Sequence, residues 1–243
     1  MTIDINCDLG EGGSFDEALM PLISSCNIAC GGHYGNQESV HSTVALAKAH
    51  NVKVGAHPSY PDLANFGRQS IHMSATELKR SLHEQIDLVE TACLAEAVKW
   101  HHIKPHGALY NDMHKKQSIA DLVLEVCMER QCPIILFLPP GVQFSEAVPE
   151  QIQIWKEGFA DRAYHKNLSL VSRLKDKAVL HNPKQISQRV LEMILQQRVE
   201  TYSGSKTPLH VDTICVHSDT PNSLKILQDL QSKLTQKGIQ IRA

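Results

Sequence analysis

The residues of this sequence that could carry chemistry come directly after short apolar runs. Six runs are followed in this way, by Asp8 and Glu11, by His33, by His57, by Lys104 and His106, by Asp161 and Arg162, and by His217 and Asp219. Carboxylates and imidazoles transfer protons or hold divalent metals, and Lys and Arg bind anions. One histidine in such a place is more often a loop residue bonded to backbone, but six runs with the same pattern indicate a shared site.

A metal centre is one interpretation of this pattern. One carboxylate with two or three imidazoles can hold a divalent ion that polarises an amide carbonyl or activates water. The candidate ligands are Asp8, His33, His57 and His106. Acid–base catalysis without a metal is the other interpretation, in which Lys104, Arg68 and Arg162 bind an anionic substrate or phosphate. The histidines are far apart in the sequence, so their spacing leaves both interpretations open.

The remaining histidines of polar segments are expected on helices or in loops without a chemical role. They are His41, His50, His72, His83, His114, His165 and His181.

Composition and motifs exclude several classes of function. The 24 basic and 26 acidic residues give a net charge of −2, which argues against a nucleic-acid or anionic-membrane partner. No run approaches the length of a membrane helix, and no secretory signal is expected at the N-terminus. Gly10, Gly12 and Gly13 do not match the dinucleotide fingerprint, and residues 204–207 (GSKT) lack the glycine before lysine of a P-loop.

The seven cysteines predict free thiols in a reducing cytoplasm. Their number is odd, most lie within apolar stretches, and none forms a Cys-x-x-Cys pair. A disulfide framework and a zinc knuckle are therefore not expected.

Apolar runs rich in β-branched residues alternate with segments of helical period. Strands are predicted at residues 3–9, 27–30, 52–56, 101–104, 133–138, 152–159 and 213–216. Helices are predicted near 15–23, after an N-cap at Asn36, after the capping box that begins at Ser74, at 119–129, from Pro183, and after Thr220 as N-cap. Residues 139–150 and 202–208 are turn-rich and are predicted to be excursions from the same core.

Repeated strand–helix units predict parallel strands joined by right-handed crossovers. No linker divides the sequence, so we expect one domain over residues 1–243. The first expectation is a closed or nearly closed α/β barrel, and an open doubly wound sheet is the second. In a barrel the ends of all the strands open onto one rim, where barrels of this kind place their active sites.

Eight blocks of this sequence resemble the LamB/YcsF family. They are residues 4–12 (DINCDLGEG), 27–31 (NIACG), 55–63 (GAHPSYPDL), 66–68 (FGR), 104–111 (KPHGALYN), 159–162 (FADR), 170–173 (LVSR) and 215–221 (CVHSDTP). The resemblance runs in order over essentially the whole chain. It implies a distorted (β/α) barrel of the glycoside hydrolase/deacetylase type.

The resemblance also implies an activity, because this family is the A subunit of the bacterial ATP-dependent 5-oxoprolinase. The implied reaction converts 5-oxoproline, ATP and water to glutamate, ADP and phosphate, and it implies two further subunits, B and C. The implied polar rim consists of Asp8, Glu11, His33, His57, Lys104, His106, Asp161, Arg162, His217 and Asp219. Because the sequence has no P-loop, we expect a partner subunit to carry the nucleotide step.

On this hypothesis Asp8 or one of the three rim histidines His33, His57 and His106 orients water. Lys104 and Arg162 stabilise negative charge as it develops. Two alternatives remain open from the sequence: a metal-dependent deacetylase of N-acetylated sugars, and a non-catalytic barrel that binds the lactam for its partners.

The sequence departs from the family pattern in its second block. Residues 30–36 (CGGHYGN) stand where Cys-Gly-Phe-His-Ala-Gly-Asp is usual, so Gly32, Tyr34 and Asn36 are the departures, and Gln69 follows Arg68 where a second Arg is usual. Asn36 caps a helix as well as Asp would. Tyr34 is expected to reshape the mouth of the pocket, with an effect on substrate preference.

Overall fold

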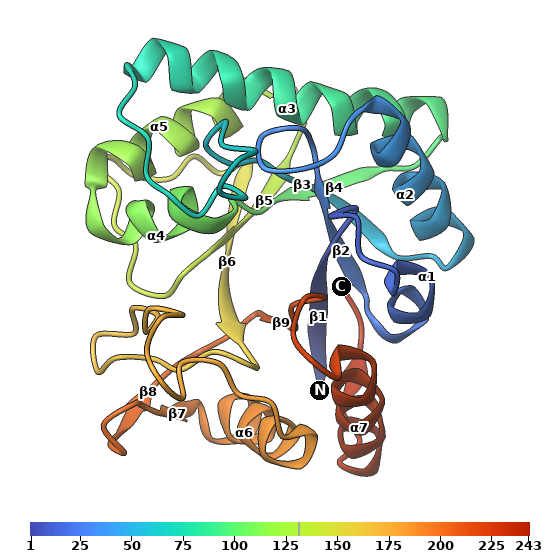
Figure 1. Cartoon of the computed structure of the whole chain (residues 1–243), viewed down its shortest axis with the longest axis vertical. Coiled ribbons are helices and arrows are strands. Elements are labelled where there is room, and N and C mark those ends of the chain that lie inside the picture. Colours follow the sequence, from blue (N-terminus) through green and yellow to red (C-terminus); the bar gives the residue numbers. More distant parts are fainter. Residues whose placement is uncertain (131) are drawn as a thin grey trace.

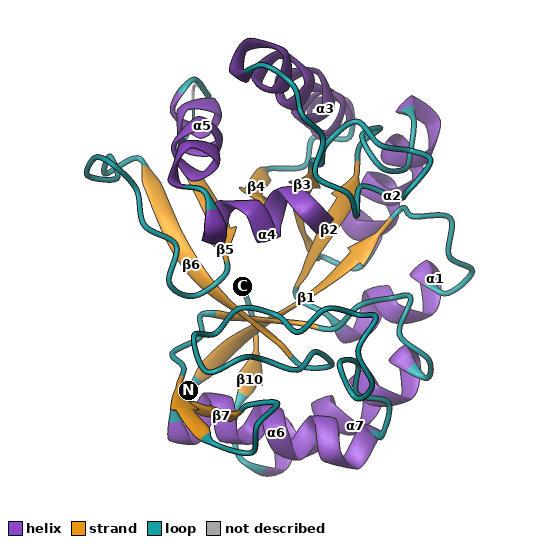
Figure 2. Ribbon diagram, turned by 60° about the vertical axis from the view of Figure 1, so that its left-hand side comes forward, coloured by secondary structure: helices purple, strands orange, loops and turns teal. Residues whose placement is uncertain are grey.

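Parallel strands close into a barrel in the computed structural model, which describes residues 1–130 and 132–243. The ring consists of β1 (Thr2–Leu9), β2 (Ser25–Ala29), β3 (Lys53–His57), β4 (Trp100–Ile103), β5 (Ile134–Leu138), β6 (Ile152–Phe159) and β9 (Thr213–Cys215). The ring is closed because β1 pairs with β2 on one side and with β9 on the other. Figure 2 shows the strands β1 to β6 arranged around the interior. A short strand, β10 (Gln240–Ile241), pairs with the start of β1.

Helices surround the barrel on its outer side (Figure 1). They are α1 (Asp16–Leu19), the 3₁₀ turn η1 (Met20–Leu22), α2 (Gln37–Ala49), α3 (Ala75–Ala95), α4 (Gly107–Lys115), α5 (Gln117–Met128), α6 (Pro183–Gln196) and α7 (Ser223–Gln236). A two-stranded antiparallel sheet of β7 (Arg198–Glu200) and β8 (Lys206–Pro208) follows α6. No helix among the described residues is both long enough and apolar enough to cross a bilayer.

The first expected fold class, a parallel (β/α) barrel, is confirmed, and so is the alternation of strands and helices. Asn36 caps α2 by accepting a hydrogen bond from the Ser39 backbone N–H at 3.0 Å, as predicted. Ser74 and Glu77 form the predicted capping box of α3. All seven cysteines are unpaired, as expected.

One local prediction was wrong, and one helix was missed. The last helix is capped by Asn222 rather than by Thr220, whose hydroxyl instead donates to Asp161. The helix α4 was not predicted, because its N-terminal Pro105, His106 and Gly107 read as a turn, and Gly107 indeed has a φ of +56°. The segment 202–208 contains the strand β8 as well as a turn.

The interior of the barrel is polar, although barrels of this type are usually filled by branched apolar residues. Asn6 on β1 donates to Glu157 on β6 at 2.8 Å and to Thr213 on β9 at 2.7 Å. Asn27 on β2 donates to Asn6 at 2.7 Å, and His102 on β4 lies 2.8 Å from Asn27. These buried hydrogen bonds connect β1, β2, β4, β6 and β9 across the ring and fix these strands relative to one another.

Candidate active site

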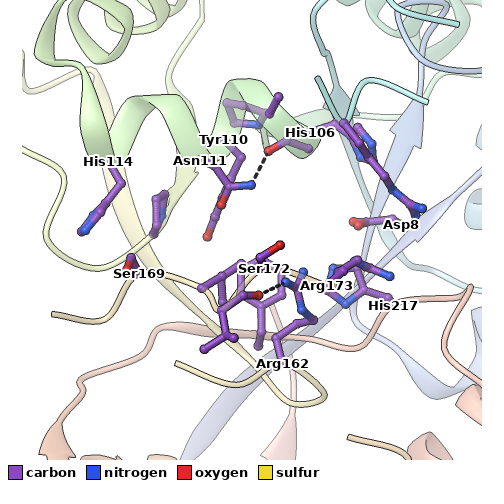
Figure 3. Close-up of a pocket in the computed structure, with 18 of the residues that line it drawn as sticks. Asp8, His106, Tyr110, Asn111, His114, Arg162, Ser169, Ser172, Arg173 and His217 are labelled. Atoms are coloured by element: carbon purple, nitrogen blue, oxygen red, sulfur yellow. Dashed lines mark hydrogen bonds between the residues drawn. The ribbon is translucent and has the colours of Figure 1, made fainter. Parts of the chain in front are cut away.

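A cavity of about 930 Å³ opens at the carboxyl ends of the barrel strands (Figure 3). Of the residues predicted from the sequence, its lining includes Asp8, Glu11, His57, Arg68, Lys104, His106, Arg162, His217 and Asp219. The two other predicted residues lie just behind the wall: buried His33 contacts Glu11, and buried Asp161 contacts His217. The residues singled out from the sequence therefore lie at one end of the barrel.

The Asp8 carboxylate at the end of β1 is fixed by buried donors. Its Oδ1 accepts from Lys104 Nζ at 2.7 Å and from Asn27 Nδ2 at 2.8 Å, and its Oδ2 lies 3.4 Å from His57 Nε2. Burial alone would raise the pKa of Asp8, but the charges of His57 and Lys104 outweigh it and hold the pKa well below its usual range. Asp8 is thus an ionised carboxylate with one oxygen turned toward the imidazoles.

Lys104 is buried in the barrel interior behind Asp8. Besides Asp8, its Nζ lies 3.1 Å from Glu157 Oε1, 3.3 Å from Asn6 Oδ1 and 3.1 Å from Cys215 Sγ. Burial alone would lower the pKa of Lys104, but the neighbouring Asp8 carboxylate raises it well above the ordinary value. An ammonium has three protons, and these four neighbours occupy them. Lys104 lines the cavity, but its ammonium is engaged by these buried neighbours and holds Asp8 in place.

Three imidazoles and a carboxylate form a second cluster beside Asp8. His33 Nε2 lies 2.9 Å from Glu11 Oε1, and His106 Nδ1 lies 2.9 Å from His57 Nε2 and 3.7 Å from Glu11 Oε1. One ligand atom of each of the four residues lies within 4.8 Å of every other. Glu11 is the carboxylate of this cluster, and Asp8 Oδ2 lies 3.4 Å from His57 Nε2.

The backbone fixes the orientation of two of these rings. His57 Nδ1 lies 2.6 Å from the Lys104 carbonyl, and His106 Nε2 lies 3.0 Å from the Phe66 carbonyl. Carbonyls only accept, so each of these nitrogens carries the hydrogen. Burial, reinforced by the neighbouring His33 and His57, lowers the pKa of His106 well below its ordinary value.

The opposite wall of the cavity is cationic. Arg162 is buried, and its Nη2 donates to the Val171 carbonyl at 2.8 Å. Burial and the nearby Arg173 lower the pKa of Arg162 to about 10. At the mouth, Asp219 Oδ2 accepts from Arg68 at 2.7 Å and from Arg173 at 3.3 Å. One carboxylate thus serves two guanidiniums, so this wall is suited to an additional anion.

Asp161 positions His217 from behind the cavity wall. The two Asp161 oxygens lie 2.9 and 3.1 Å from His217 Nδ1, and Thr220 donates to the same carboxylate. Burial alone would raise the pKa of Asp161, but His217 and Thr220 outweigh it and lower the pKa to about 2. The His217 ring also stacks on Phe159 at 5.0 Å between centroids.

Several residues of the site were not singled out from the sequence. Arg173 belongs to a block that carried the family resemblance, but nothing local marked it as a site residue. Glu157 is hidden in the middle of a strand-like run, where its position facing the barrel interior follows only from the two-residue period of β6. His114 and His165 line the cavity, although both were expected to be inert.

The departures from the family pattern have local explanations. A Cβ on Gly32 would lie 2.2 Å from Gln85 Oε1 and 2.5 Å from Ser59 Oγ, so buried Gln85 fills the space beside this residue. Tyr34 is 40% exposed, and its hydroxyl covers Gly12 on the turn that carries Glu11.

The blocks quoted from the sequence occur in this geometry on the ends of the strands, and the model of the LamB/YcsF family matches residues 3–243. This chain belongs to the LamB/YcsF family. A family member from Clostridium beijerinckii, named as the A subunit of 5-oxoprolinase, is 38% identical over 98% of this chain and 96% of its own length. The crystal structure of a lactam utilization protein from Thermus thermophilus covers all of both chains at 32% identity, with a TM-score of 0.91.

The likeness of this LamB/YcsF barrel to deacetylases is one of fold. A structure described as T48 deacetylase with substrate covers 99% of this chain and 86% of its own, with a TM-score of 0.51 and 16% identity.

Proposed function

We propose that this chain is the A subunit of an ATP-dependent 5-oxoprolinase, a hydrolase that opens the lactam of 5-oxoproline to give L-glutamate. The observation that carries the proposal is a cavity with an ionised carboxylate, Asp8, on one wall and a buried guanidinium, Arg162, on the other. The names of its relatives support the choice of the lactam.

The proposed substrate, 5-oxoproline, has chemical groups that suit both walls of the cavity. Its own carboxylate is an anion, for which Arg162 and Arg173 supply charge-assisted donors. Its lactam is a planar amide stabilised by resonance and resists attack by water. Transfer of a phosphoryl group from ATP to the amide oxygen, with release of ADP, removes that resonance. The lactam carbonyl carbon then becomes susceptible to attack by water.

Asp8 is the proposed general base for that water. Its Oδ2 is the oxygen turned toward the imidazoles, and the contacts of Lys104 and Asn27 to Oδ1 keep the carboxylate ionised and oriented. We assign Lys104 a positioning role in place of the direct stabilisation of charge expected from the sequence. His217, held by Asp161, lines the same cavity and is proposed to contact the substrate.

The remaining parts of the reaction are assigned to the complex. ATP is the proposed co-substrate, and subunits B and C are the proposed partners that supply the nucleotide step. The seven unpaired cysteines support a cytoplasmic location, where thiols stay reduced.

The test is reconstitution. The purified chain, its candidate partner subunits, 5-oxoproline and ATP are mixed, and glutamate release is measured. The Asp8→Asn variant should lose at least about 100-fold in rate, which is the scale of general-base catalysis. His41→Ala, which changes an exposed imidazole on α2, should keep the full rate. If Asp8→Asn turns over normally, Asp8 has no catalytic role.

A second candidate is metal-dependent deacetylation of an N-acetylated sugar. The cluster of His33, His57, His106 and Glu11 is the observation that favours it. Acetate release from an N-acetylated oligosaccharide by the chain alone, abolished by a chelator and restored by Zn²⁺, would support this candidate over the lactam.

A further inference from the structure

The facing ring nitrogens of His57 and His106 lie close enough to need a positive centre between them, which is either a proton or a metal ion. His57 Nδ1 and His106 Nε2 each donate a hydrogen to a backbone carbonyl. In neutral rings the remaining nitrogens, His57 Nε2 and His106 Nδ1, both carry lone pairs, yet they lie 2.9 Å apart. Two acceptors at this distance repel each other unless a positive centre lies between them.

Glu11 adds a negative charge at the same point. Its Oε1 lies 3.7 Å from His106 Nδ1, and one of its carboxylate oxygens lies within 4.8 Å of a ring nitrogen of His57. Ligands on one zinc ion, with bonds of about 2.0–2.1 Å, lie roughly 3.4 Å apart in tetrahedral geometry. We propose that His57, His106 and Glu11 bind one divalent ion of the zinc class, with the fourth position open to the cavity.

The arrangement behind the rings is typical of metal ligands. A histidine that binds metal usually donates its other N–H to a carbonyl or carboxylate, which fixes the ring and its tautomer. His57 and His106 both do so, through the carbonyls of Lys104 and Phe66. Two imidazoles, one carboxylate and an open position form a ligand set found in hydrolytic zinc enzymes.

His33 belongs to this site as a positioning residue and not as a ligand. Its ring stacks on that of His106 with 3.7 Å between centroids and 7° between planes. A metal lies near the plane of each imidazole that binds it, so two stacked rings do not both point at one ion. His33 Nε2 instead contacts Glu11 Oε1 at 2.9 Å and orients the carboxylate.

Asp8 is likewise outside the ligand set. Its Oδ1 is occupied by Lys104 and Asn27, and its Oδ2 faces His57 from the side of the barrel interior. Asp8 therefore remains beside the ion as a base. The inference deepens the proposed function by adding a Lewis acid to the same cavity, but binding of the ion does not depend on which amide is hydrolysed.

Titration with Co²⁺ tests the inference without any activity measurement. The full chain is treated with a chelator, dialysed and titrated with Co²⁺, and its visible absorption and bound cobalt are measured. We expect one ion per chain with the intense bands of a site of low coordination number. His106→Asn and Glu11→Gln should each weaken binding by at least about 100-fold, and His33→Gln by roughly 10-fold with an unchanged spectrum.

Controls separate this site from other imidazoles and from loss of fold. His41→Ala should bind one Co²⁺ with the wild-type spectrum, and circular dichroism should show all variants folded. If the folded wild type binds no Co²⁺, or if His106→Asn binds it as tightly as the wild type, the proposal is overturned; in the first case a shared proton lies between the rings. Glutamate release is measured separately, so a metal site without oxoprolinase turnover would refute only the proposed function.

Discussion

Lys104 Nζ and Asp8 Oδ1 lie 2.7 Å apart inside the barrel, with almost no exposure of either side chain. The pair joins β1 to the loop after β4 across the ring of strands. Removing one member leaves an uncompensated buried charge, which typically costs about 3–5 kcal/mol. We expect Lys104→Met to lower the free energy of unfolding by that amount in denaturant titrations.

The double variant distinguishes pairing from simple loss of packing. Asp8→Asn combined with Lys104→Met removes both charges, so it should be more stable than Lys104→Met alone, with a coupling energy above about 1 kcal/mol. Additive effects of the two changes would contradict the account of Lys104 as the group that holds Asp8.

Arg162→Lys should weaken binding of the lactam. The guanidinium is buried, donates to Val171 and lines the cavity, and lysine cannot reproduce its planar set of donors. We expect KM for 5-oxoproline to rise roughly 10-fold, about 1.4 kcal/mol of binding energy, in the reconstituted system. Arg80→Lys on the exposed side of α3 is the matched control. An unchanged KM in Arg162→Lys would remove this residue from the substrate site.

The contribution of Asp161 to the free energy of unfolding should depend on pH. Its pKa in the folded state is lowered to about 2, so the contribution is present above the unfolded value of about 3.9 and is lost as pH falls toward 2. The size is roughly 2 kcal/mol. Denaturant titrations at pH values near 5 and near 2 measure the free energy of unfolding. Between these two pH values it should fall less for Asp161→Asn than for the wild type. Equal losses would mean that Asp161 is not paired with His217 as described.

Gly32→Ala should destabilise the protein. Its Cβ would meet Gln85 Oε1 at 2.2 Å, and Gln85 cannot move freely because it bonds both the N–H and the carbonyl of Ser59 at 2.9 Å. Forcing an extra methyl group into a packed site costs about 1–3 kcal/mol. Thermal unfolding measures the change. Gly204→Ala tests conformation alone, because no atom lies near its added Cβ although its φ is +82°. A loss at Gly32 no larger than that at Gly204 would refute the steric explanation.

The sequence predicted the barrel because its signals are local. Apolar runs, capping residues such as Asn36 and Ser74, and helical stripes each act over a few residues, and each was found as expected. The helix α4 was missed for a local reason too: Gly107 at its start occupies a conformation that usually ends a helix.

The separate roles of the site residues could not be predicted in the same way. Asp8 lies at the end of β1 and Glu11 follows it three residues later, but the role of each depends on contacts distant in sequence. Lys104, 96 residues from Asp8, binds Asp8 Oδ1, and His33 contacts Glu11 Oε1. The stacking of His33 on His106 likewise depends on how two loops pack. Sequence spacing identified the members of the site, and only the tertiary structure separates ligand, base and positioning residue.

Release of glutamate by the reconstituted complex shows whether this chain takes part in opening the lactam. This chain is combined with subunits B and C, 5-oxoproline and ATP, and glutamate and phosphate are measured over time, with each component omitted in turn. We expect equal amounts of the two products only in the complete mixture, and release slowed by at least about 100-fold with Asp8→Asn. Glutamate formed without this chain, or formed at the full rate with Asp8→Asn, would contradict this expectation.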